Sequence, residues 1–543
     1  MKQELRAIEK LEKFEDAMVK EIIKDSEGKK DKVFEIVQFD DIESTVHGTL
    51  ERNARAWEQA GAGEFVVNVI KEGFKLNMME MPGKYEEKNN QSYLKHKEFA
   101  NEAVMKLVNM KVLEEVDKVK VDCINPLTVA VKDEKKLLCI DLSCYINEFT
   151  VAKKFKIEST VQFLQVVKQG DYMYAFDLKS AYHQVPMFEG HWRYLGLSVV
   201  IDGIKKYFVF TCLPFGLNDA AKALTKLLRF PLQSWRVGGE VFHPSGRRHR
   251  AVQGEKEAQE VANRVKANLH EFGLLTSDKK CTWKVTQELE WTGWRINTAE
   301  FKIYVTEKKL LKAELKLEVL LQMRGKRNKV KDLCSVVGLI ISFGLGVGRA
   351  ARFHKRFSTI EVAKVVDKRG WGFVLVMSEE VMEELSFWKE NVRSLNGQPI
   401  RMRAGVTVVK PKMCYSDAGG HMAGGARIED SRVCDNSVFQ INLSSEEVSK
   451  SSTFRELRGI EEGLKALRSE VTGGAVRWHC DNWGACKIVE YGSTKKDCHE
   501  VAVRINKLIN KYKVDFEIVW QSRETEEIRF ADRVSKDFEL GTT

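Results

Sequence analysis

The sequence predicts an α+β protein of several domains that ends in a separate α/β unit, and three observations indicate this. Over residues 65–297, β-rich runs such as PLTVAV, YMYAFDL and KKYFVFTCLPFG alternate with helical stretches, which is typical of an antiparallel sheet packed with helices. Residues 306–396 are nearly all helical in pattern. After the turn-forming string SLNGQPI, strands and helices alternate again from about Arg401 to the end.

The length and composition of the chain limit the number of domains and show that they can bury apolar cores. At roughly 150 residues per domain, 543 residues suggest three or four units, and 43% hydrophobic residues are enough to bury their cores. We expect an extension over 1–60, followed by domains over 61–300, 301–400 and 401–543.

The net charge and the cysteine content indicate the kind of partner and the redox compartment of the protein. The net charge of +10 favours polyanionic partners such as nucleic acid, although charge alone is weak evidence. The 11 cysteines include no C-x-x-C pair, which argues against a disulfide framework or a zinc module and favours a reducing compartment. The amino terminus lacks the apolar core of a signal peptide, so we expect an intracellular protein.

The longest apolar run, VVGLIISFGLGVG at 336–348, is shorter than the roughly 20 residues that cross a bilayer, so it predicts a buried helix and no membrane span. The helical segment that precedes it is rich in basic side chains. The usual interpretation of such a run is a solvated helix face. Its members are Lys308, Lys309, Lys312, Lys316, Arg324, Lys326, Arg327, Lys329 and Lys331.

The first candidate site surrounds Asp177, which ends a β-rich run in YAFDLKSAYHQVPM. A lone Asp in this place would more often cap the following turn. Its neighbours complete the pattern D-x-x-x-A-Y-x-x-V-P, which closely resembles the first catalytic motif of reverse transcriptases. The resemblance implies that Asp177 is a Mg²⁺ ligand and that Tyr182 excludes the 2′-OH of a ribonucleotide.

Further segments resemble the same family in the same order. Residues 125–147 resemble the fingers segment over the incoming triphosphate, although Leu137 stands where relatives commonly carry Arg. LPFGLNDAAKALTKLL resembles the motif that supports template and nucleotide, FGLLTSDKKCTW the lysine motif, and LEWTGWRI the primer grip. The substrate-binding residues implied are Lys132, Lys135, Lys136, Phe215, Gly216, Lys280 (or its neighbour Lys279), Trp291 and Gly293, with Trp294 beside them.

One part of that family's pattern is missing. Phosphoryl transfer to a primer needs two metal ions held by several converging carboxylates. Reverse transcriptases take two of these from an Asp-Asp hairpin, but here that interval contains FHPSGRRHR at 242–250, with no adjacent acids. Basic side chains repel Mg²⁺. We therefore expect little or no DNA synthesis by this chain.

The genetic code suggests why the acids are missing. When residues 242–250 are back-translated and the first base is dropped, permitted codon choices read FIHLDDGIG, an apolar strand that runs into Leu-Asp-Asp-Gly. We therefore hypothesise two compensating frame changes, either lesions in a decaying element or errors in the sequence. The nucleotide sequence across codons 236 to 256 tests this hypothesis.

The second candidate site lies in the last unit. Asp417 and Asp481 each end a β-rich run, Glu456 lies in an amphipathic helix, and Asp532 lies near the start of a last helix. Each acid alone would more often be a surface charge. Their order resembles ribonuclease H, which implies that the four carboxylates hold two Mg²⁺ (or Mn²⁺) ions and hydrolyse RNA in an RNA–DNA hybrid. The mobile His of some relatives is absent, and Ile528-Arg529-Phe530 replaces a polar residue before the last Asp.

The resemblance as a whole is to the reverse transcriptase–ribonuclease H segment of retrotransposons, and EELSFWKENVRSLNGQPI and VWQSRETEEIRFADRVSK place it nearest the tyrosine-recombinase (DIRS/Ngaro-like) type. It implies an α+β right-hand polymerase with fingers, palm and thumb, followed by an α/β ribonuclease H-like domain. The implied partners are RNA template, DNA primer, RNA–DNA hybrid and deoxynucleoside triphosphates, in cytoplasm or nucleus. Two alternatives stay open: an inactive protein that only binds hybrid, and a nonfunctional translated relic.

Overall fold

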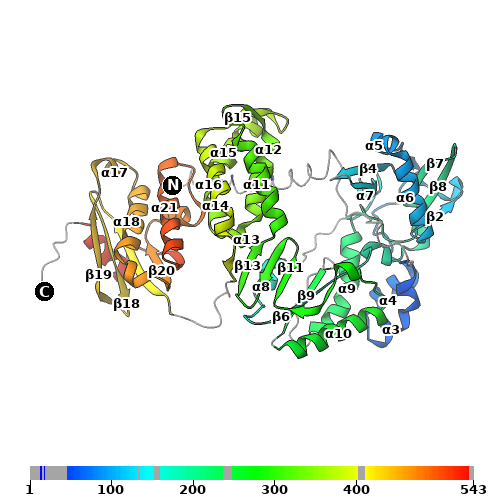
Figure 1. The fold of residues 1–543 in the computed structure, drawn as a ribbon, viewed down its shortest axis with the longest axis horizontal. Coiled ribbons are helices and arrows are strands. Elements are labelled where there is room, and N and C mark those ends of the chain that lie inside the picture. Colours follow the sequence, from blue (N-terminus) through cyan, green and yellow to red (C-terminus); the bar gives the residue numbers. More distant parts are fainter. Residues whose placement is uncertain are drawn as a thin grey trace. The chain divides into compact units, whose positions relative to one another are not determined.

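The computed structural model describes residues 46–132, 135–151, 159–236, 247–252, 254–400 and 410–536, together with Leu11, Lys13, Phe14 and Met18. The chain forms a first unit, Lys24–Lys302, and a second unit, Ile303–Thr543, to which Met1–Ile23 also belongs. Buried apolar side chains form a separate core in each unit. Figure 1 shows that both units combine helices with strands.

The first unit combines helices with strands, and most of its strands form sheets, whereas β4 and β5 form a separate hairpin. Its helices are α2 (Thr49–Arg52), α3 (Ala54–Gln59), α4 (Glu64–Glu72), α5 (Gln91–Lys95), α6 (Lys97–Asn109), η2 (Lys118–Lys120), α7 (Ile146–Phe149), α8 (Thr160–Leu164), η3 (Ala181–Gln184), η4 (Glu189–Tyr194), α9 (Ala220–Arg236), α10 (Glu255–Glu271) and η5 (Asp278–Lys280). Its strands are β1 (Tyr85–Glu86), β2 (Leu113–Val116), β3 (Cys123–Ile124), β4 (Leu127–Lys132), β5 (Lys135–Ile140), β6 (Tyr172–Asp177), β7 (Gly196–Ile201), β8 (Ile204–Phe210), β9 (Arg247–Val252), β10 (Thr282–Thr286), β11 (Glu288–Trp291) and β12 (Trp294–Asn297).

The sheet that carries the first candidate site has the strand order β10-β6-β9. Its central strand β6 is antiparallel to both neighbours. Helix α10 packs against all three strands, because apolar residues from Ala258 to Leu269 recur every three or four positions and form one buried face. Another sheet has the order β1-β3-β7-β8-β2, and β4 pairs with β5 as a hairpin. The predicted α+β architecture with an antiparallel sheet is confirmed.

Residues 46–59 of the expected extension belong to the core of the first unit, whereas its other described residues, Leu11, Lys13, Phe14 and Met18, belong to the second unit. Trp57 on α3 is fully buried, and its indole N–H donates a 2.9 Å hydrogen bond to the carbonyl oxygen of Phe272. Val46, Leu50 and Ala54 lie in the same apolar cluster. Residues 46–59 therefore help to fold the unit, and the rest of the expected extension lies almost entirely outside the described residues.

The second unit begins with a mainly helical part. Its elements are β13 (Lys302–Val305), α11 (Glu307–Leu321), β14 (Arg327–Lys329), α12 (Val330–Ser342), α13 (Gly344–Val347), α14 (Ala350–Phe353), α15 (Arg356–Arg369), β15 (Val374–Val376), α16 (Glu379–Leu395) and β16 (Gln398–Pro399). The apolar run at 336–348 forms α12 and α13, with Val336, Val337 and Ile340 buried, so the predicted buried helix is confirmed. Within the described ranges, no helix combines the length and apolarity that crossing a membrane requires.

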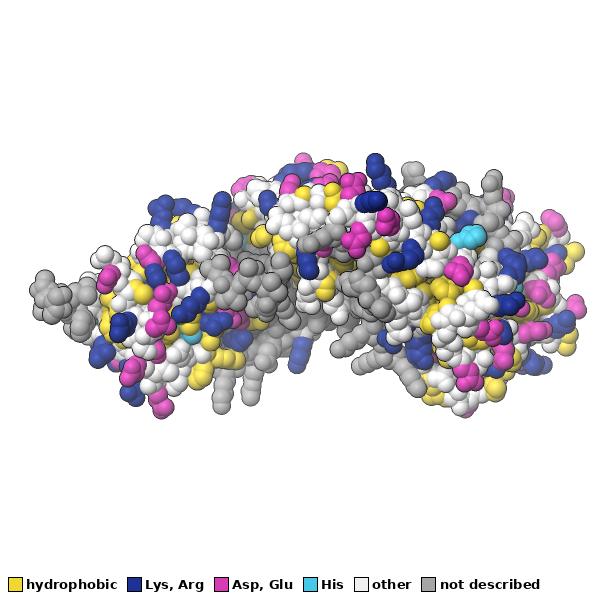
Figure 2. Space-filling model, turned by 90° about the horizontal axis from the view of Figure 1, so that it is seen from below, with side chains coloured by type: hydrophobic (Ala, Val, Ile, Leu, Met, Phe, Trp, Pro, Cys, Tyr) yellow, Lys and Arg dark blue, Asp and Glu magenta, His cyan; other side chains and the backbone are white. Residues whose placement is uncertain are grey.

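Ion pairs link two helices of this part. Arg393 on α16 bonds to Glu307 and Glu314 on α11 at 2.7 and 2.6 Å, and Lys389 on α16 pairs with Glu318 at 3.1 Å. Acidic and basic side chains are also interspersed on the face drawn in Figure 2. The acids of α11 therefore join this helix to α16 through ion pairs.

The last part of the second unit is an α/β domain. Its strands are β17 (Lys412–Ala418), β18 (Met422–Glu429), β19 (Arg432–Asn442), β20 (Ala475–Cys480) and β21 (Asp515–Trp520). Its helices are α17 (Ser445–Ser449), α18 (Ser452–Ala466), α19 (Arg468–Val471), α20 (Trp483–Tyr491), α21 (Lys496–Lys511) and α22 (Glu526–Val534). The strand order is β19-β18-β17-β20-β21, antiparallel up to β17 and parallel beyond it.

Alternate residues of β17 face different layers of this domain. Cys414 belongs to the core formed with α18, α20 and α21, whereas Tyr415 packs with Ile528 and Ala531 of α22. The helices therefore cover both faces of the sheet, and β17 is its central strand. The α/β unit predicted for this part of the chain is confirmed.

Candidate active site

The four acids of the last domain come from elements that meet at one edge of the sheet. Asp417 lies near the end of β17, and Asp481 directly follows the end of β20, the parallel neighbour of β17. In the ladder between these strands, Tyr415 of β17 pairs with His479 of β20. The two acids are each two residues past that pair, so they lie level with one another. Glu456 projects from α18 and Asp532 from α22, and both helices pack on β17.

A glycine allows α18 to lie close to the sheet. At Gly459, one turn from Glu456, an added Cβ would lie 3.3 Å from the Cβ of Ala423 on β18. That spacing is already tight, so a larger side chain would push the helix and its acid outward. The short residue therefore sets the distance between Glu456 and the acids of the strands.

The electrostatics show that these acids gather in one place. Asp417 and Glu456 are each only 2% exposed. Burial raises the pKa of Glu456 well above its ordinary value, and the charges of Asp417 and Asp481 raise it further. Burial also raises the pKa of Asp417, and the charges of Asp481 and Asp532 add to this increase. Acidic groups that perturb one another in this way cluster at functional sites.

A second buried acid of the same helix provides a contrast. Glu461 on α18 is also 2% exposed, but Arg504 bonds to both of its carboxylate oxygens, at 2.9 and 3.1 Å, and Arg458 pairs with it as well. Burial raises the pKa of Glu461, yet these two guanidinium groups outweigh burial and lower it. Glu461 is a structural ion pair, whereas Glu456 faces other acids.

Oxygen atoms without partners point to a divalent cation. Among the described residues, the Oδ1 atoms of Asp417 and Asp481 are buried and accept no hydrogen bond. The other oxygen of Asp417, Oδ2, accepts a 2.8 Å bond from the hydroxyl of Ser535. Buried carboxylate oxygens without donors are unfavourable in a protein unless a metal takes them. The donor set of hard oxygens fits Mg²⁺ or Mn²⁺.

Residues beyond the four acids also contact the cluster. The thiol of Cys480 lies 3.7 Å from Oε2 of Glu456, and the ligand atoms of Glu456, Cys480 and Asp481 all lie within 4.8 Å of one another. Arg523 pairs with Asp481 through its Nε, and Lys536 pairs with Asp532 at 2.7 Å. The sequence patterns gave no signal for Arg523, Ser535 or Cys480, because their roles depend on contacts that only the fold creates.

The first candidate site has a different environment. Asp177 ends β6, and its carboxylate lies 3.9 Å from the amino group of Lys280. Its neighbour across the ladder in β9 is Arg247. In the part of the chain that the structure describes, no set of three ligand-type side chains gathers at Asp177. Residues 242–246 of the basic string lie outside the described residues.

The residues expected to hold a nucleotide are partly brought together. The rings of Tyr182 and Phe215 meet edge to face at 4.9 Å. Gly216 has a φ of 97°, which favours glycine, and its carbonyl oxygen accepts a 2.7 Å bond from Asn147. Lys132 and Lys135 pair across the β4–β5 hairpin, and Lys136 is exposed on it. Their predicted contacts with phosphate stay predictions.

The predicted primer grip is a tight hairpin. Trp291 of β11 pairs with Trp294 of β12 across a turn in which Thr292 and Gly293 both have positive φ, 46° and 79°. This is the pattern of a two-residue hairpin turn. Trp291 is 3% exposed and meets Phe163 edge to face at 5.7 Å, so in this structure its side chain anchors the hairpin.

The fold is that of a right-hand reverse transcriptase followed by a ribonuclease H-like domain. No protein-family model matches the sequence. The chain is similar to the solved structure of a foamy viral protease-reverse transcriptase in complex with double-stranded DNA, with a TM-score of 0.50 and 13% identity over 88% of this chain and 97% of that chain. The predicted fold class is thereby confirmed.

Two further solved structures from foamy virus are similar to the chain. The protease-reverse transcriptase dRH in complex with double-stranded DNA gives a TM-score of 0.49 and 13% identity over 88% of this chain and 81% of that chain. The protease-reverse transcriptase in complex with an RNA/DNA hybrid gives 0.47 and 12% over 91% of this chain and 64% of that chain.

Proposed function

We propose that this chain derives from the reverse transcriptase–ribonuclease H of a retrotransposon of the DIRS/Ngaro-like type, and that its working centre is the nuclease. The reaction is metal-dependent hydrolysis of the RNA strand of an RNA–DNA hybrid. The observation that carries this proposal is the gathering of Asp417, Glu456 and Asp481, with two buried carboxylate oxygens that have no partner among the described residues.

The chain's own residues have distinct roles in this proposal. Asp417, Glu456, Asp481 and Asp532 would hold two Mg²⁺ ions, which supply an activated water and stabilise the leaving oxygen. Ser535 holds Oδ2 of Asp417 and so turns Oδ1 toward the cation site. The thiol of Cys480 contacts Glu456 from the strand side and restricts its carboxylate in the same way. The oxygen ligands are thus oriented before an ion binds.

The polymerase half has lost synthesis in this proposal. Asp177 keeps its place at the end of β6, but the residue opposite it is Arg247 and its neighbour is Lys280. Within the described ranges, Asp177 belongs to no set of three ligand-type side chains, whereas two divalent ions need several converging carboxylates. RNA template, DNA primer and deoxynucleoside triphosphates are therefore ancestral partners, and the retained partner is the hybrid, in cytoplasm or nucleus.

A hybrid-cleavage assay tests the proposal. The purified full chain is incubated with a labelled RNA–DNA hybrid and Mg²⁺, beside Asp417→Asn and Asp481→Asn. Cleavage by the wild type that both variants lose supports the nuclease. Hybrid binding without cleavage by the wild type replaces it with the alternative function, a protein that only holds hybrid.

A further inference from the structure

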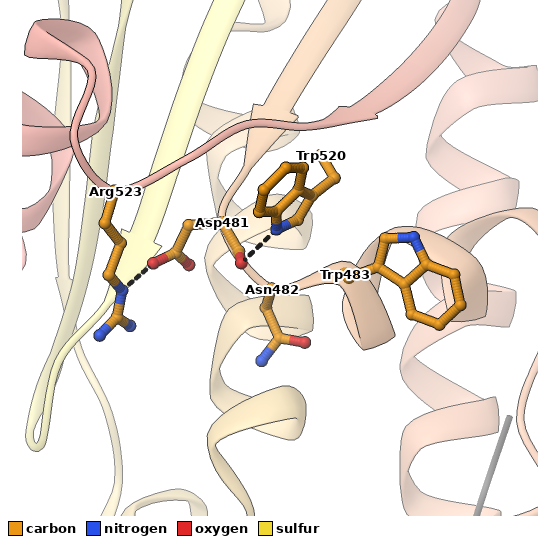
Figure 3. A pocket seen from close by; sticks show the side chains of 5 residues that line it. All are labelled: Asp481, Asn482, Trp483, Trp520 and Arg523. Atoms are coloured by element: carbon orange, nitrogen blue, oxygen red, sulfur yellow. Dashed lines mark hydrogen bonds and ion pairs between the residues drawn. The ribbon is translucent and has the colours of Figure 1, made fainter. Parts of the chain in front are cut away.

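The connection between β21 and α22 carries a cation that faces the nuclease acids. Nε of Arg523 pairs with Oδ2 of Asp481, as Figure 3 shows. The exposures of the two side chains are very different: 74% for Arg523 and 3% for Asp481. A solvent-exposed guanidinium therefore pairs with a buried carboxylate.

The influence of Arg523 extends beyond Asp481. Its hydrogen bond and charge interaction with Asp481 raise the pKa of its guanidinium, and the charges of Asp417 and Glu456 add to this effect. In the metal-free protein, Arg523 thus partly neutralises the same negative charge that divalent ions would neutralise. Arg523 holds Oδ2 of Asp481 and leaves Oδ1 without a partner, so a divalent ion at Oδ1 would lie on the same carboxylate as the guanidinium, and the two positive charges would disfavour one another.

A cavity adjoins the side chain of Arg523 and could hold it away from Asp481. A cavity of about 650 Å³ is lined by Asp481, Asn482, Trp483, Trp520 and Arg523. The indole N–H of Trp520 donates a 2.8 Å bond to the carbonyl oxygen of Asp481, which fixes one wall (Figure 3). The side chain of Asn482 accepts a bond from the backbone of Ala485 and caps α20, which fixes the floor. Trp520 and Asn482 are thus held by hydrogen bonds, whereas the Arg523 side chain is 74% exposed beside the same cavity.

We propose that Arg523 occupies Asp481 in the metal-free protein, is displaced when a divalent ion binds there, and then binds a phosphate of the hybrid in the adjoining cavity. Guanidinium groups bind phosphate with paired, charge-assisted hydrogen bonds, so the displaced side chain has a suitable partner on the substrate. Arg523 is thus a phosphate-binding residue that also weakens metal binding until substrate is present. This inference rests on the proposed nuclease function.

Metal affinity measured without substrate is the primary test. Mn²⁺ is titrated calorimetrically into the full chain and into Arg523→Ala, and Asp417→Asn supplies the blank that identifies the heat of this site. We expect Arg523→Ala to bind Mn²⁺ about threefold to tenfold more tightly, because the ion no longer competes with an ion pair. Arg523→Lys should lie between the two. Unchanged or weaker binding overturns the competition.

A matched control and a second readout complete the test. Arg477 forms a 2.8 Å pair with Glu517 on the neighbouring strands, and Arg477→Ala should leave the Mn²⁺ affinity unchanged.

At saturating Mg²⁺, the KM for hybrid should rise about fivefold to tenfold in Arg523→Ala with a smaller change in kcat. An unchanged KM overturns the phosphate contact. If the wild type does not cleave at all, the proposed function fails, while the Mn²⁺ titration still decides the competition. Arg523→Gln serves if the alanine variant does not fold.

Discussion

Asp177 of β6 and Arg247 of β9 lie directly opposite one another in the sheet of the first unit. In the shifted reading FIHLDDGIG of residues 242–250, the second Asp falls at position 247. The backbone therefore pairs the retained acid with the position that the shifted reading makes acidic. This correspondence supports the hypothesis that a reverse transcriptase hairpin once occupied this segment.

Replacing FHPSGRRHR at 242–250 by FIHLDDGIG should restore polymerase activity. The new carboxylates would join Asp177 and complete a two-metal site, so we expect Mg²⁺-dependent primer extension at least about a hundredfold above the unchanged chain. Adding Asp177→Asn to the repaired chain should return extension to background. A folded, repaired chain that extends no primer would remove the support for the frame-change hypothesis.

Glu456→Gln should abolish cleavage and stabilise the metal-free fold. Glu456 is buried beside Asp417 and Asp481, so its charge costs free energy until a cation binds. In EDTA, we expect the free energy of unfolding of the second unit to rise by about 1 kcal/mol or more, measured by urea denaturation. A less stable variant would contradict the inferred repulsion.

Glu461→Gln, on the same helix, should have the opposite effect on the free energy of unfolding. Its carboxylate is paired with Arg504 and Arg458, and removing its charge takes one ion pair from each of these guanidinium groups. We expect a loss of about 1–3 kcal/mol in the free energy of unfolding. The same urea experiment compares the two variants, and equal effects at 456 and 461 would show that burial alone, without the neighbouring acids, explains both.

Glu384 should make the second unit less stable as pH rises from about 4.5 to 7. This buried carboxyl accepts bonds of 2.7 to 2.9 Å from Phe357 N and from Ser358 N and Oγ, at the start of α15. Burial nevertheless raises its pKa to about 7, so in this window the folded state keeps a proton that the unfolded state has released. The expected loss is about 3 kcal/mol, present in full above pH 7.

Urea denaturation at several pH values, in excess Mg²⁺ to hold the nuclease acids ionised, measures this dependence. Glu384→Gln cannot titrate, so the slope should flatten between pH 4.5 and 7 even though the absolute stability changes. A wild-type chain whose stability rises with pH across that window would contradict the raised pKa of the buried Glu384 carboxyl.

Ser535→Ala should weaken the nuclease without removing a metal ligand. Its hydroxyl fixes Oδ2 of Asp417 at 2.8 Å, so its loss frees the carboxylate to rotate. We expect Mn²⁺ binding about tenfold weaker by calorimetry, with cleavage reduced to a similar extent. Ser444→Ala, which removes the helix cap of α17 and no bond to any of the four acids, is the control and should bind Mn²⁺ normally. Normal Mn²⁺ affinity in Ser535→Ala would show that the bond has no orienting role.

Several parts of the structure follow directly from sequence patterns. Asp417 and Asp481 end apolar runs that form parallel neighbours, and Glu456 lies in a helix with clear apolar spacing, so local patterns were enough to predict their elements. Arg523 and Ser535 gave no such signal, because each reaches its acid from a segment distant in sequence, 42 and 118 residues away.

Tertiary context also formed a strand that the pattern did not predict. The string RRHRAV has no apolar alternation, yet its backbone pairs with β6 over the whole length of β9. Backbone pairing with β6 therefore accompanies a strand that the residue pattern alone does not predict. In the same way, Trp291 matched a substrate-contacting motif, but in the folded hairpin its ring is buried.

The most direct test of the account is cleavage of the RNA strand of a defined RNA–DNA hybrid by the purified chain in Mg²⁺. The account predicts cleavage that EDTA abolishes and that Asp417→Asn and Glu456→Gln each reduce by at least about a hundredfold while both variants stay folded. Cleavage that survives in either variant, or a folded wild-type chain that never cuts the hybrid, would contradict it.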